Sequence, residues 1–469
     1  MPSDLADHSA AELARLVCTR EVSPVEVLDA CLKRVEQYNP TINAVVTLNE
    51  RARDDARELE RRLVRGETPG PLCGLPVGIK DVTPVAGLRT TFGSPLYKDF
   101  VPAADALVVQ RLRTAGAVIL GKTNTPEFAA GGNTFNEVFG RTRNPWDSTK
   151  SAGGSTGGGC AALATGMIAL GEGTDLGGSL RIPASFCGVV GIRPSVGLVP
   201  THPSDWVWDT LQVTGPVART AEDLGLMLQV VAGPSPLAPL AQPTAGRTFF
   251  PLPRAIRPGA AVAYCRDIAG IGIDPEIERV CREAAFALRD AGATVEEIPF
   301  DLAFGRPTYL ALRGLWFVAQ MYPRLDQLDR LGVNVANNVK GGLKFTTQEL
   351  AAAEAARGRL WHMFRELFER FAYLLTPCMA VPPFPVEQDY PETVAGKKME
   401  TYVDWLAPTF VLSLAGLPVA SVPCGLDPGG LPVGLQIVGP QLGEEAVLAL
   451  AAEIQRLRPI GKPPLSALK

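Results

Sequence analysis

Two short glycine-rich segments hold the residues of this chain that are best suited to chemistry. Residues 153–159 read GGSTGGG and residues 174–181 read TDLGGSLR, so Ser155 and Ser179 both stand in backbone with few side chains. Glycine has no Cβ, so such backbone can turn tightly and aim successive N–H groups at one point. Two serines beside such donors are the raw material for a nucleophile and an oxyanion hole.

A nucleophilic serine needs a base, and histidine is the usual one. The chain has three histidines, His8, His202 and His362, and none of them adjoins the glycine-rich segments. The sequence lacks the GxSxG elbow at Ser179. It contains no HExxH zinc motif and no GxxxxGK[ST] phosphate loop. We therefore expect no metal and no cofactor, and we expect the histidines to be structural.

A lysine is the remaining choice of base. Lys80 ends the apolar run LPVGIK and precedes Asp81, and Lys122 stands in a similar setting in GKTNTPE. Burial disfavours the charged form of an amine, so the pKa of a buried lysine falls and the neutral form can accept a proton near pH 7. The residues by themselves leave open which of the two lysines is the base.

The elements that must position these residues alternate between strands and helices. Short apolar runs around Lys80 and Leu120 predict buried strands, and residues 103–115 between them predict a helix. Capping patterns at Ser9 and Ser23 predict N-terminal helices, and further helices are expected over residues 49–65, 276–291 and 348–371. The runs MIAL, GVVGI, LLTP, ASVPCG and VGLQIVG predict more strands. This alternation predicts an α/β fold.

Composition predicts an ordinary globular protein. The 469 residues are 46% hydrophobic and 20% charged, with a net charge of −4, which argues against nucleic acid as a partner. The N-terminus shows no secretory signal and no apolar run is long enough to span a membrane, so we expect a soluble cytoplasmic protein. The nine cysteines form no metal-binding spacing and are expected to be reduced core thiols. Strand patterns lie on both sides of a proline-rich connector at residues 233–259, which favours a single domain over residues 1–469.

Taken in order, the motifs resemble those of the amidase signature family. They are GIKD, GKTNTPEF, RNPWD, GGSTGGG and GTDLGGSLRIPASFCGVVGIRPS, followed near the C-terminus by GLPVASVPCG and GLPVGLQIVGP. The resemblance spans most of the chain and is weakest over residues 234–374. It implies a large mixed β-sheet flanked by helices on both faces. It also implies a core signature region at about residues 70–230 and a variable, substrate-lining region at about residues 234–410.

The resemblance also implies a Ser–cisSer–Lys triad. Lys80 would be the base, Ser155 the bridging serine that follows a cis peptide bond, and Ser179 the nucleophile. The implied oxyanion hole consists of the backbone N–H groups of Leu176, Gly177, Gly178 and Ser179. A side chain at either glycine would block the close approach of a substrate, which accounts for the pair.

Three further positions are expected to contact the substrate. By register with the family, the carbonyl of Ala129 would line the substrate site. Thr156 stands where many members have a second serine, and its hydroxyl would support Ser155. Asp175 and Arg181 flank the nucleophile, and either a structural ion pair or a direct catalytic role fits them. In the weakly matching centre, Trp316 and its neighbours belong either to the core or to a pocket for aryl or hydrophobic acyl groups.

The function implied is hydrolysis of a carboxylic amide to a carboxylate and an amine or ammonia through a seryl acyl-enzyme. The same chemistry extends to aryl amides, esters and carbamates. Two alternatives stay open: the A subunit of a tRNA-dependent glutaminyl amidotransferase, and a non-catalytic binding protein. The expected partner is a small-molecule amide, without nucleic acid or membrane, and a homodimer is an option.

Overall fold

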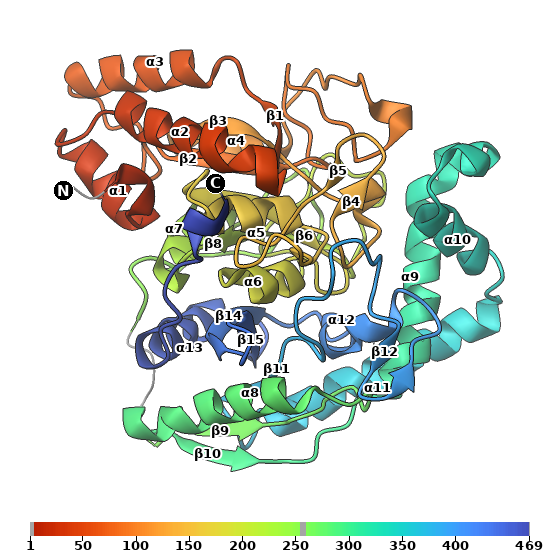
Figure 1. Cartoon of the computed structure of the whole chain (residues 1–469). Coiled ribbons are helices and arrows are strands. Elements are labelled where there is room, and N and C mark those ends of the chain that lie inside the picture. Colours follow the sequence, from red (N-terminus) through yellow and green to blue (C-terminus); the bar gives the residue numbers. More distant parts are fainter. Residues whose placement is uncertain (1–3, 254–258, 469) are drawn as a thin grey trace.

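A single large sheet organises the molecule (Figure 1). The computed structural model describes residues 4–253 and 259–468, and eleven of the strands in them form this sheet in the order β1-β3-β2-β6-β8-β7-β14-β15-β11-β9-β10. Their bounds are β1 (Val45–Leu48), β2 (Pro76–Lys80), β3 (Val118–Thr123), β6 (Leu170–Asp175), β7 (Val190–Arg193), β8 (Val213–Ala218), β9 (Ala261–Tyr264), β10 (Thr294–Glu297), β11 (Tyr373–Pro377), β14 (Val419–Leu426) and β15 (Pro432–Val438). Two small hairpins pair β4 (Phe135–Asn136) with β5 (Gly140–Arg141) and β12 (Thr393–Val394) with β13 (Lys397–Lys398).

The sheet is mixed, as the resemblance implies. Strand β2 runs parallel to both β3 and β6, and β9 runs parallel to β10 and β11. The central strands β6, β8, β7, β14 and β15 are joined to one another by antiparallel pairing. Because β2 and β6 are parallel neighbours, residues at their carboxyl ends lie at the same edge of the sheet.

The helices cover the sheet and form a separate group at one end. Their bounds are α1 (Ala10–Cys18), α2 (Pro24–Ile42), α3 (Ala52–Val64), α4 (Leu107–Thr114), α5 (Gly157–Ala164), α6 (Arg181–Cys187), α7 (Ala221–Val231), α8 (Pro275–Ala287), α9 (Gly305–Met321), α10 (Val333–Gly342), α11 (Thr347–Leu367), α12 (Ala407–Ser413) and α13 (Glu444–Leu457). Helix α2 begins with the predicted capping box of Ser23 and Glu26. Helices α9, α10 and α11 pack together beside the sheet (Figure 1).

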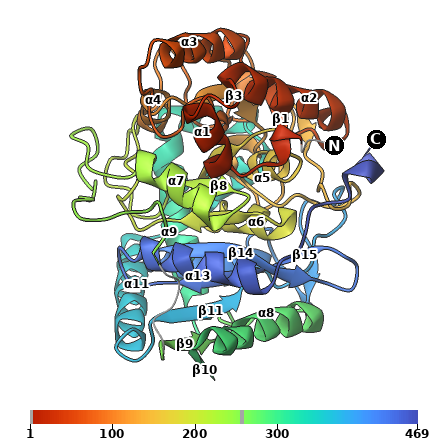
Figure 2. The ribbon, with the colours of Figure 1, turned by 90° about the vertical axis from the view of Figure 1, so that its left-hand side faces the viewer.

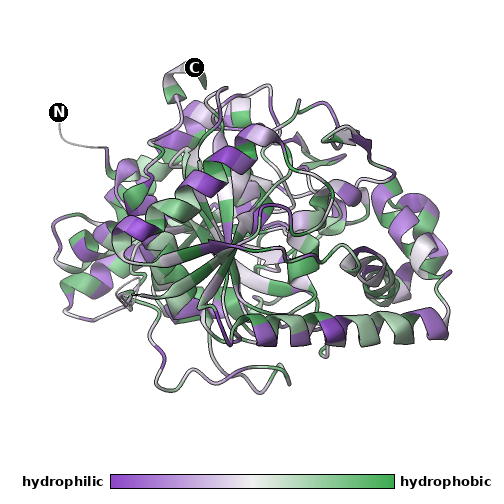
Figure 3. Cartoon of the chain, turned by 90° about the horizontal axis from the view of Figure 1, so that it is seen from below, coloured by the Kyte–Doolittle hydropathy of each residue, from purple (hydrophilic) through white to green (hydrophobic). Residues whose placement is uncertain are grey.

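Helices lie on both faces of the sheet, which confirms the predicted layers. Along β15, Gly434 faces Ser185 of α6, whereas the paired strand β14 turns Gly425 toward Val280 of α8. Helices α7, α13 and α8 lie in front of the sheet in Figure 2, and α5 packs beside α6 on the other side. In Figure 3 the strands in the middle are mostly green and purple residues gather on the outer helices, which is the pattern of a buried sheet.

The strands on both sides of the proline-rich connector join the same sheet. Strands β1 to β8 precede residues 233–259, and β9 to β15 follow them. Within the connector, residues 254–258 lie outside the described residues. Buried apolar side chains form two clusters, a larger one on the sheet and a second one around α9 to α12. The single-domain assignment stays a prediction.

The structure also bears on the cysteines and on the search for membrane-spanning helices. All nine cysteines are free and eight of them are buried, as expected of reduced core thiols. No helix in the described part of the chain combines the length and the apolar character that crossing a bilayer requires.

The strand predicted at MIAL lies further along the chain than expected. Strand β6 runs over Leu170–Asp175, so the residues GEGTD form the central strand and most of MIAL precedes it. Every residue of β6 is buried, including Glu172 and Thr174. The apolar pattern misleads here because polar side chains can be buried once hydrogen bonds satisfy them, and those partners come from distant residues.

Candidate active site

The two glycine-rich segments meet at the carboxyl end of β6. Ser155 lies just before α5, and Ser179 lies in the turn between β6 and α6. The N–H of Thr156 donates a hydrogen bond to the carbonyl of Ser179 at 3.1 Å, which holds the two serine segments side by side. The Gly154–Ser155 peptide is cis, as the resemblance implies.

Lys80 is fully buried at the last position of β2, with its amine against Ser155. Its Nζ lies 2.6 Å from Ser155 Oγ and 3.0 Å from Thr174 Oγ1. Burial lowers the pKa of Lys80 to about 7, against the opposing effect of Glu172 and Asp175. A neutral amine at this position can accept the Ser155 proton.

Lys122 has the same burial but a different partner. It lies within β3, next to β2, and its Nζ donates to the carbonyl of Thr83. Burial lowers its pKa to about 8. A carbonyl oxygen has no proton to give, so this contact offers the Lys122 amine no proton to accept. Of the two lysines left open by the residues, the structure brings Lys80 to the bridging serine.

Hydrogen bonds to the Asp175 carboxylate hold the turn that carries Ser179. The Asp175 carboxylate accepts the N–H of Gly178 at 2.8 Å and that of Leu180 at 3.2 Å. The Gly178 N–H is therefore already engaged. Of the four expected oxyanion donors, this leaves the N–H groups of Leu176, Gly177 and Ser179. Ser179 is partly exposed, whereas Ser155 is fully buried.

Packing explains why the two positions before Ser179 are glycines, which the sequence alone did not reveal. A Cβ on Gly177 would collide with the hydroxyl of Tyr309, and one on Gly178 would collide with Thr409. Gly178 also has φ +126°, which disfavours any side chain. Glycine is required here because residues of α9 and α12 press on the turn.

Asp175 and Arg181 form a fully buried ion pair. Arg181 Nε and Nη2 lie 3.0 and 3.1 Å from the two Asp175 oxygens, and Arg193 Nη1 lies 3.5 Å from Oδ1. Although burial by itself raises it, the two guanidinium groups hold the pKa of Asp175 down to about 2. The pair is inaccessible to solvent and anchors the Ser179 turn.

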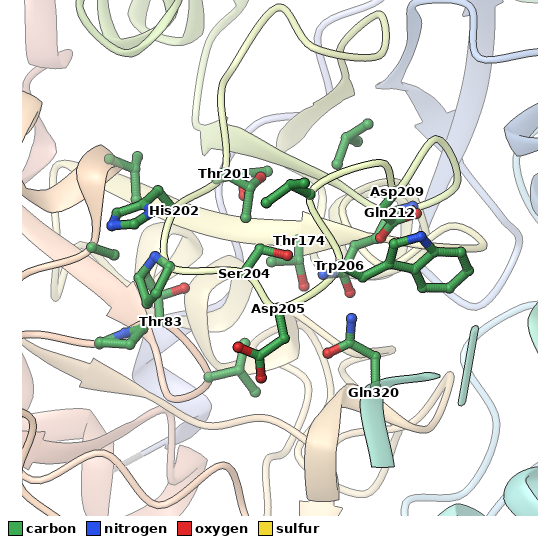
Figure 4. A pocket seen from close by; sticks show the side chains of 18 of the residues that line it. Thr83, Thr174, Thr201, His202, Ser204, Asp205, Trp206, Asp209, Gln212 and Gln320 are labelled. Carbon is green, nitrogen blue, oxygen red and sulfur yellow. Dashed lines mark hydrogen bonds between the residues drawn. The ribbon is translucent and has the colours of Figure 1, made fainter. Parts of the chain in front are cut away.

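A cavity of about 440 Å³ opens beside this centre (Figure 4). Thr174, which contacts the Lys80 amine, and Ala129 are among its lining residues. Across the cavity, Asp205 from the loop after β7 and Gln320 from α9 extend toward the same space. Its aromatic lining residues are Phe92, Tyr97, Phe100, Phe128, Trp206 and Trp316. The lining comes from both the signature region and the central region.

Of the three residues that were expected to contact the substrate, one lines the cavity. Ala129 lines the cavity, and its φ of 59° holds the backbone in the left-handed region. Thr156 and Asp175 are fully buried and do not line it. The substrate contacts of Thr156 and Asp175 stay predictions.

Trp316 and its neighbours at the end of α9 serve both the core and the cavity. Trp316, Phe317 and Met321 belong to the second buried cluster, and Trp316 and Met321 also line the cavity. Tyr322, which follows the helix, is 73% exposed. His202 also lines the cavity, although the sequence indicated a structural role for it.

Sequence reasoning missed three polar residues around Lys80: Thr83, Glu172 and Thr174. Thr174 Oγ1 is the second partner of the Lys80 amine. Glu172 accepts the backbone N–H of Lys80 at 3.1 Å and the hydroxyl of Thr83 at 2.9 Å. A signal was present, because Glu172 stands between two glycines and Thr174 directly precedes Asp175, just before the Ser179 turn.

Comparison with known proteins gives a consistent result over most of the chain. The family model described as Amidase matches residues 26–448. The chain is 36% identical to an acylamidase of Rhodococcus erythropolis, over 96% of this chain and 95% of that protein. It is 34% identical to the A subunit of the glutamyl-tRNA(Gln) amidotransferase of Geobacillus kaustophilus, over 95% and 96% of the two chains. The crystal structure of a bacterial aryl acylamidase superposes with a TM-score of 0.90 at 28% identity, covering 97% of both chains.

Proposed function

Because the chain belongs to the amidase signature family, we propose that it is a stand-alone hydrolase that cleaves a carboxylic amide through an acyl-enzyme on Ser179. Lys80 is the base and Ser155 relays the proton. The observation that most supports this proposal is the 2.6 Å separation of Lys80 Nζ and Ser155 Oγ in a fully buried setting. A buried amine with a pKa of about 7 can take up and return a proton at neutral pH.

The reaction proceeds in two halves. In the first, neutral Lys80 takes the proton of Ser155, and Ser155 takes that of Ser179. Ser179 Oγ then forms a bond to the substrate carbonyl carbon. The relay returns its proton to the amide nitrogen as the C–N bond breaks, so the amine leaves neutral. In the second half, water gives a proton to the same relay and attacks the ester, and Ser179 is released with its proton restored.

The negative charge that develops on the substrate oxygen needs donors that are not already engaged. Within residues 4–253 and 259–468, the backbone N–H groups of Leu176, Gly177 and Ser179 have no hydrogen-bond acceptor, while the Gly178 N–H donates to Asp175. We assign Gly178 to holding the turn rather than to the oxyanion. Removing one such donor typically costs about 3 kcal/mol of transition-state stabilisation.

The cavity favours substrates with an aryl or other bulky apolar group. Its aromatic lining includes Phe92, Phe128 and Trp316. Rings packed against such a substrate bury apolar surface and add ring–ring contacts worth about 0.5–1.5 kcal/mol each. The carbonyl of Ala129 lies in the same lining and is proposed to contact the substrate. Esters and carbamates fit the same acyl-enzyme chemistry.

A substrate panel tests the proposal. The isolated chain is incubated with acyl anilides, aliphatic primary amides, aryl esters and carbamates, and the released amine, ammonia or alcohol is measured. We expect the acyl anilides to be cleaved with the highest kcat/KM. Ser179→Ala is the control and should abolish turnover. An isolated chain that cleaves none of these compounds but binds them equally with and without Ser179 would instead be a binding protein.

A second candidate, one component of an amidotransferase, is favoured by one observation. The relative of that name is nearly as similar as the acylamidase, at 34% against 36% identity. Glutamine separates the two candidates. A stand-alone acylamidase should prefer acyl anilides over glutamine without any partner, whereas a chain that releases ammonia from glutamine and leaves anilides intact is the amidotransferase component.

A further inference from the structure

Glu172 is a buried carboxylate hydrogen-bonded to the backbone of Lys80. It lies in the middle of β6 with no exposed surface. Its Oε2 accepts the backbone N–H of Lys80 at 3.1 Å, and its Oε1 accepts the Thr83 hydroxyl at 2.9 Å. Burial raises the pKa of the Glu172 carboxyl, whereas the Thr83 hydroxyl, the two lysines and the Lys80 N–H favour its ionised form. The acyl-transfer steps derived above do not use this residue.

Burying such a group is unfavourable unless charges and hydrogen bonds compensate for it. Thr83 links the carboxylate to the second buried lysine, because its hydroxyl donates to Glu172 while its carbonyl accepts from Lys122. Thr83 also lines the cavity. A series of hydrogen bonds therefore runs from Lys122 through Thr83 and Glu172 to the backbone of Lys80, and Thr83 is the member of it that lines the cavity.

The other charges near Lys80 have their own partners. The groups that act on Lys80 are Glu172 and Asp175 from β6 and Cys160 from α5. The charge of Asp175 is matched by Arg181 and Arg193. Lys80 and Lys122 are the charged groups that act on Glu172, and Asp81 and Asp105 also act on Lys122. Glu172 is therefore the nearby carboxylate whose charge no arginine of this group neutralises.

Resting on the function proposed above, we propose that Glu172 is a positioning residue for the base. Its carboxylate fixes the backbone of Lys80 at the end of β2, and its negative charge sets the pH at which the Lys80 amine loses its proton. Nearby negative charge favours the protonated amine, so Glu172 opposes the effect of burial. The same carboxylate connects Thr83, which lines the cavity, to Lys80, because it accepts hydrogen bonds from the Thr83 hydroxyl and the Lys80 N–H.

Glu172→Gln tests the charge. The amide can still accept from the Lys80 N–H and can donate to the Thr83 hydroxyl, so the hydrogen bonds survive and the charge is removed. We expect the acid limb of the kcat/KM profile to move to lower pH by about 1 unit, because one adjacent charge shifts a pKa by that order. Glu172→Leu, which also removes the acceptor of the Lys80 N–H, should lower the plateau about tenfold further.

The matched control is Glu444→Gln. Glu444 is equally buried and also accepts a backbone N–H, from Ser195, but it pairs with Arg247 away from the site. Its variant should leave the acid limb where it is. A limb that stays unmoved in Glu172→Gln overturns the proposal, because a merely structural glutamate would lower activity equally at all pH values. If Glu172→Gln does not fold, Glu172→Asp and Glu172→Asn repeat the charge comparison at equal length.

A second readout separates this proposal from the proposed function. The Cε resonance of Lys80 in protein labelled with [ε-¹³C]lysine, assigned by its loss in Lys80→Met, reports protonation without any substrate. We expect its midpoint to move to lower pH in Glu172→Gln. A chain that cleaves no amide but shows this shift retains the Glu172 coupling and refutes the hydrolase. An unmoved midpoint in an active enzyme refutes the coupling.

Discussion

The carboxyl end of β2 and the adjacent part of β3 each carry a fully buried lysine, and the two lysines differ in what they touch. The strands are parallel neighbours, with Ile79 opposite Lys122 and Lys80 opposite Thr123. Burial lowers the pKa of both amines, to about 7 for Lys80 and about 8 for Lys122. Lys80 faces the hydroxyls of Ser155 and Thr174, whereas Lys122 faces the carbonyl of Thr83.

This comparison shows that burial lowers the pKa of an amine, but the neighbouring group decides whether the amine can act as a base. A base needs a proton donor within hydrogen-bond reach, and a hydroxyl is one while a carbonyl is not. The Lys122 amine instead satisfies a buried carbonyl, which is a stabilising contact. Four experiments distinguish the two lysines.

The largest expected difference is in turnover. Lys80→Ala should lower kcat/KM by roughly 10³-fold or more, because both the base and its contact with Ser155 are lost. Lys122→Ala should keep kcat/KM within about tenfold of the wild type, since the relay residues remain. Initial rates on one acyl anilide, with circular dichroism as a folding check, measure both. Equal losses from the two variants would contradict the choice of Lys80 as the base.

Stability should show the opposite ranking. Lys122→Met leaves the Thr83 carbonyl without its donor, so the free energy of unfolding should fall by about 1–3 kcal/mol. Lys80→Met removes a buried ionisable group whose hydroxyl partners belong to the active site, so it should unfold at the wild-type urea concentration or above it. Urea titrations at pH 8 provide both values. A larger loss from Lys80→Met than from Lys122→Met would refute this ranking.

The pH dependence of activity should follow the Lys80 amine. Because the reactive form is neutral, activity is lost as the pH falls through the pKa of about 7 and rises above it. About tenfold more neutral amine is present at pH 8 than at pH 6, and kcat/KM should follow this ratio. A profile that is flat from pH 6 to pH 8 is the result that would refute a neutral lysine base.

The smallest expected effect on kcat/KM comes from Thr174 near the end of β6, which is compared with Thr123 at the end of β3. Thr174→Val removes the hydroxyl 3.0 Å from Lys80 Nζ and should reduce kcat/KM roughly three- to tenfold, the equivalent of one hydrogen bond. Thr123→Val on β3 is the matched control, because the Thr123 hydroxyl is buried without a hydrogen-bond partner in the described residues. It should leave kcat/KM unchanged and preserve stability. If Thr123→Val lowers kcat/KM as much as Thr174→Val does, the loss in Thr174→Val arises from altered packing and not from the lost hydrogen bond.

Elements with a regular pattern were the most predictable. Helix α3 lies within its predicted range, and β2, β3 and β15 lie at the predicted apolar runs. Helix α11 (Thr347–Leu367) begins one residue before the predicted range 348–371 and ends four residues before its end. Strand β6 was misplaced because its residues are glycine and polar, and their burial depends on partners from β2 and the loop after it. The same dependence hid Glu172 and Thr174 from sequence reasoning.

The residue order by itself determined the chemistry that is available. The two glycine-rich serine segments, the scarcity of histidine and the lysine at the end of an apolar strand are all readable without coordinates. Tertiary structure decided which lysine meets the bridging serine, which glycine N–H is already engaged and which aromatic residues line the cavity. The reason is physical: the Lys80 contacts join residues 75 and 94 positions apart, and such distances depend on strand pairing that no local pattern encodes.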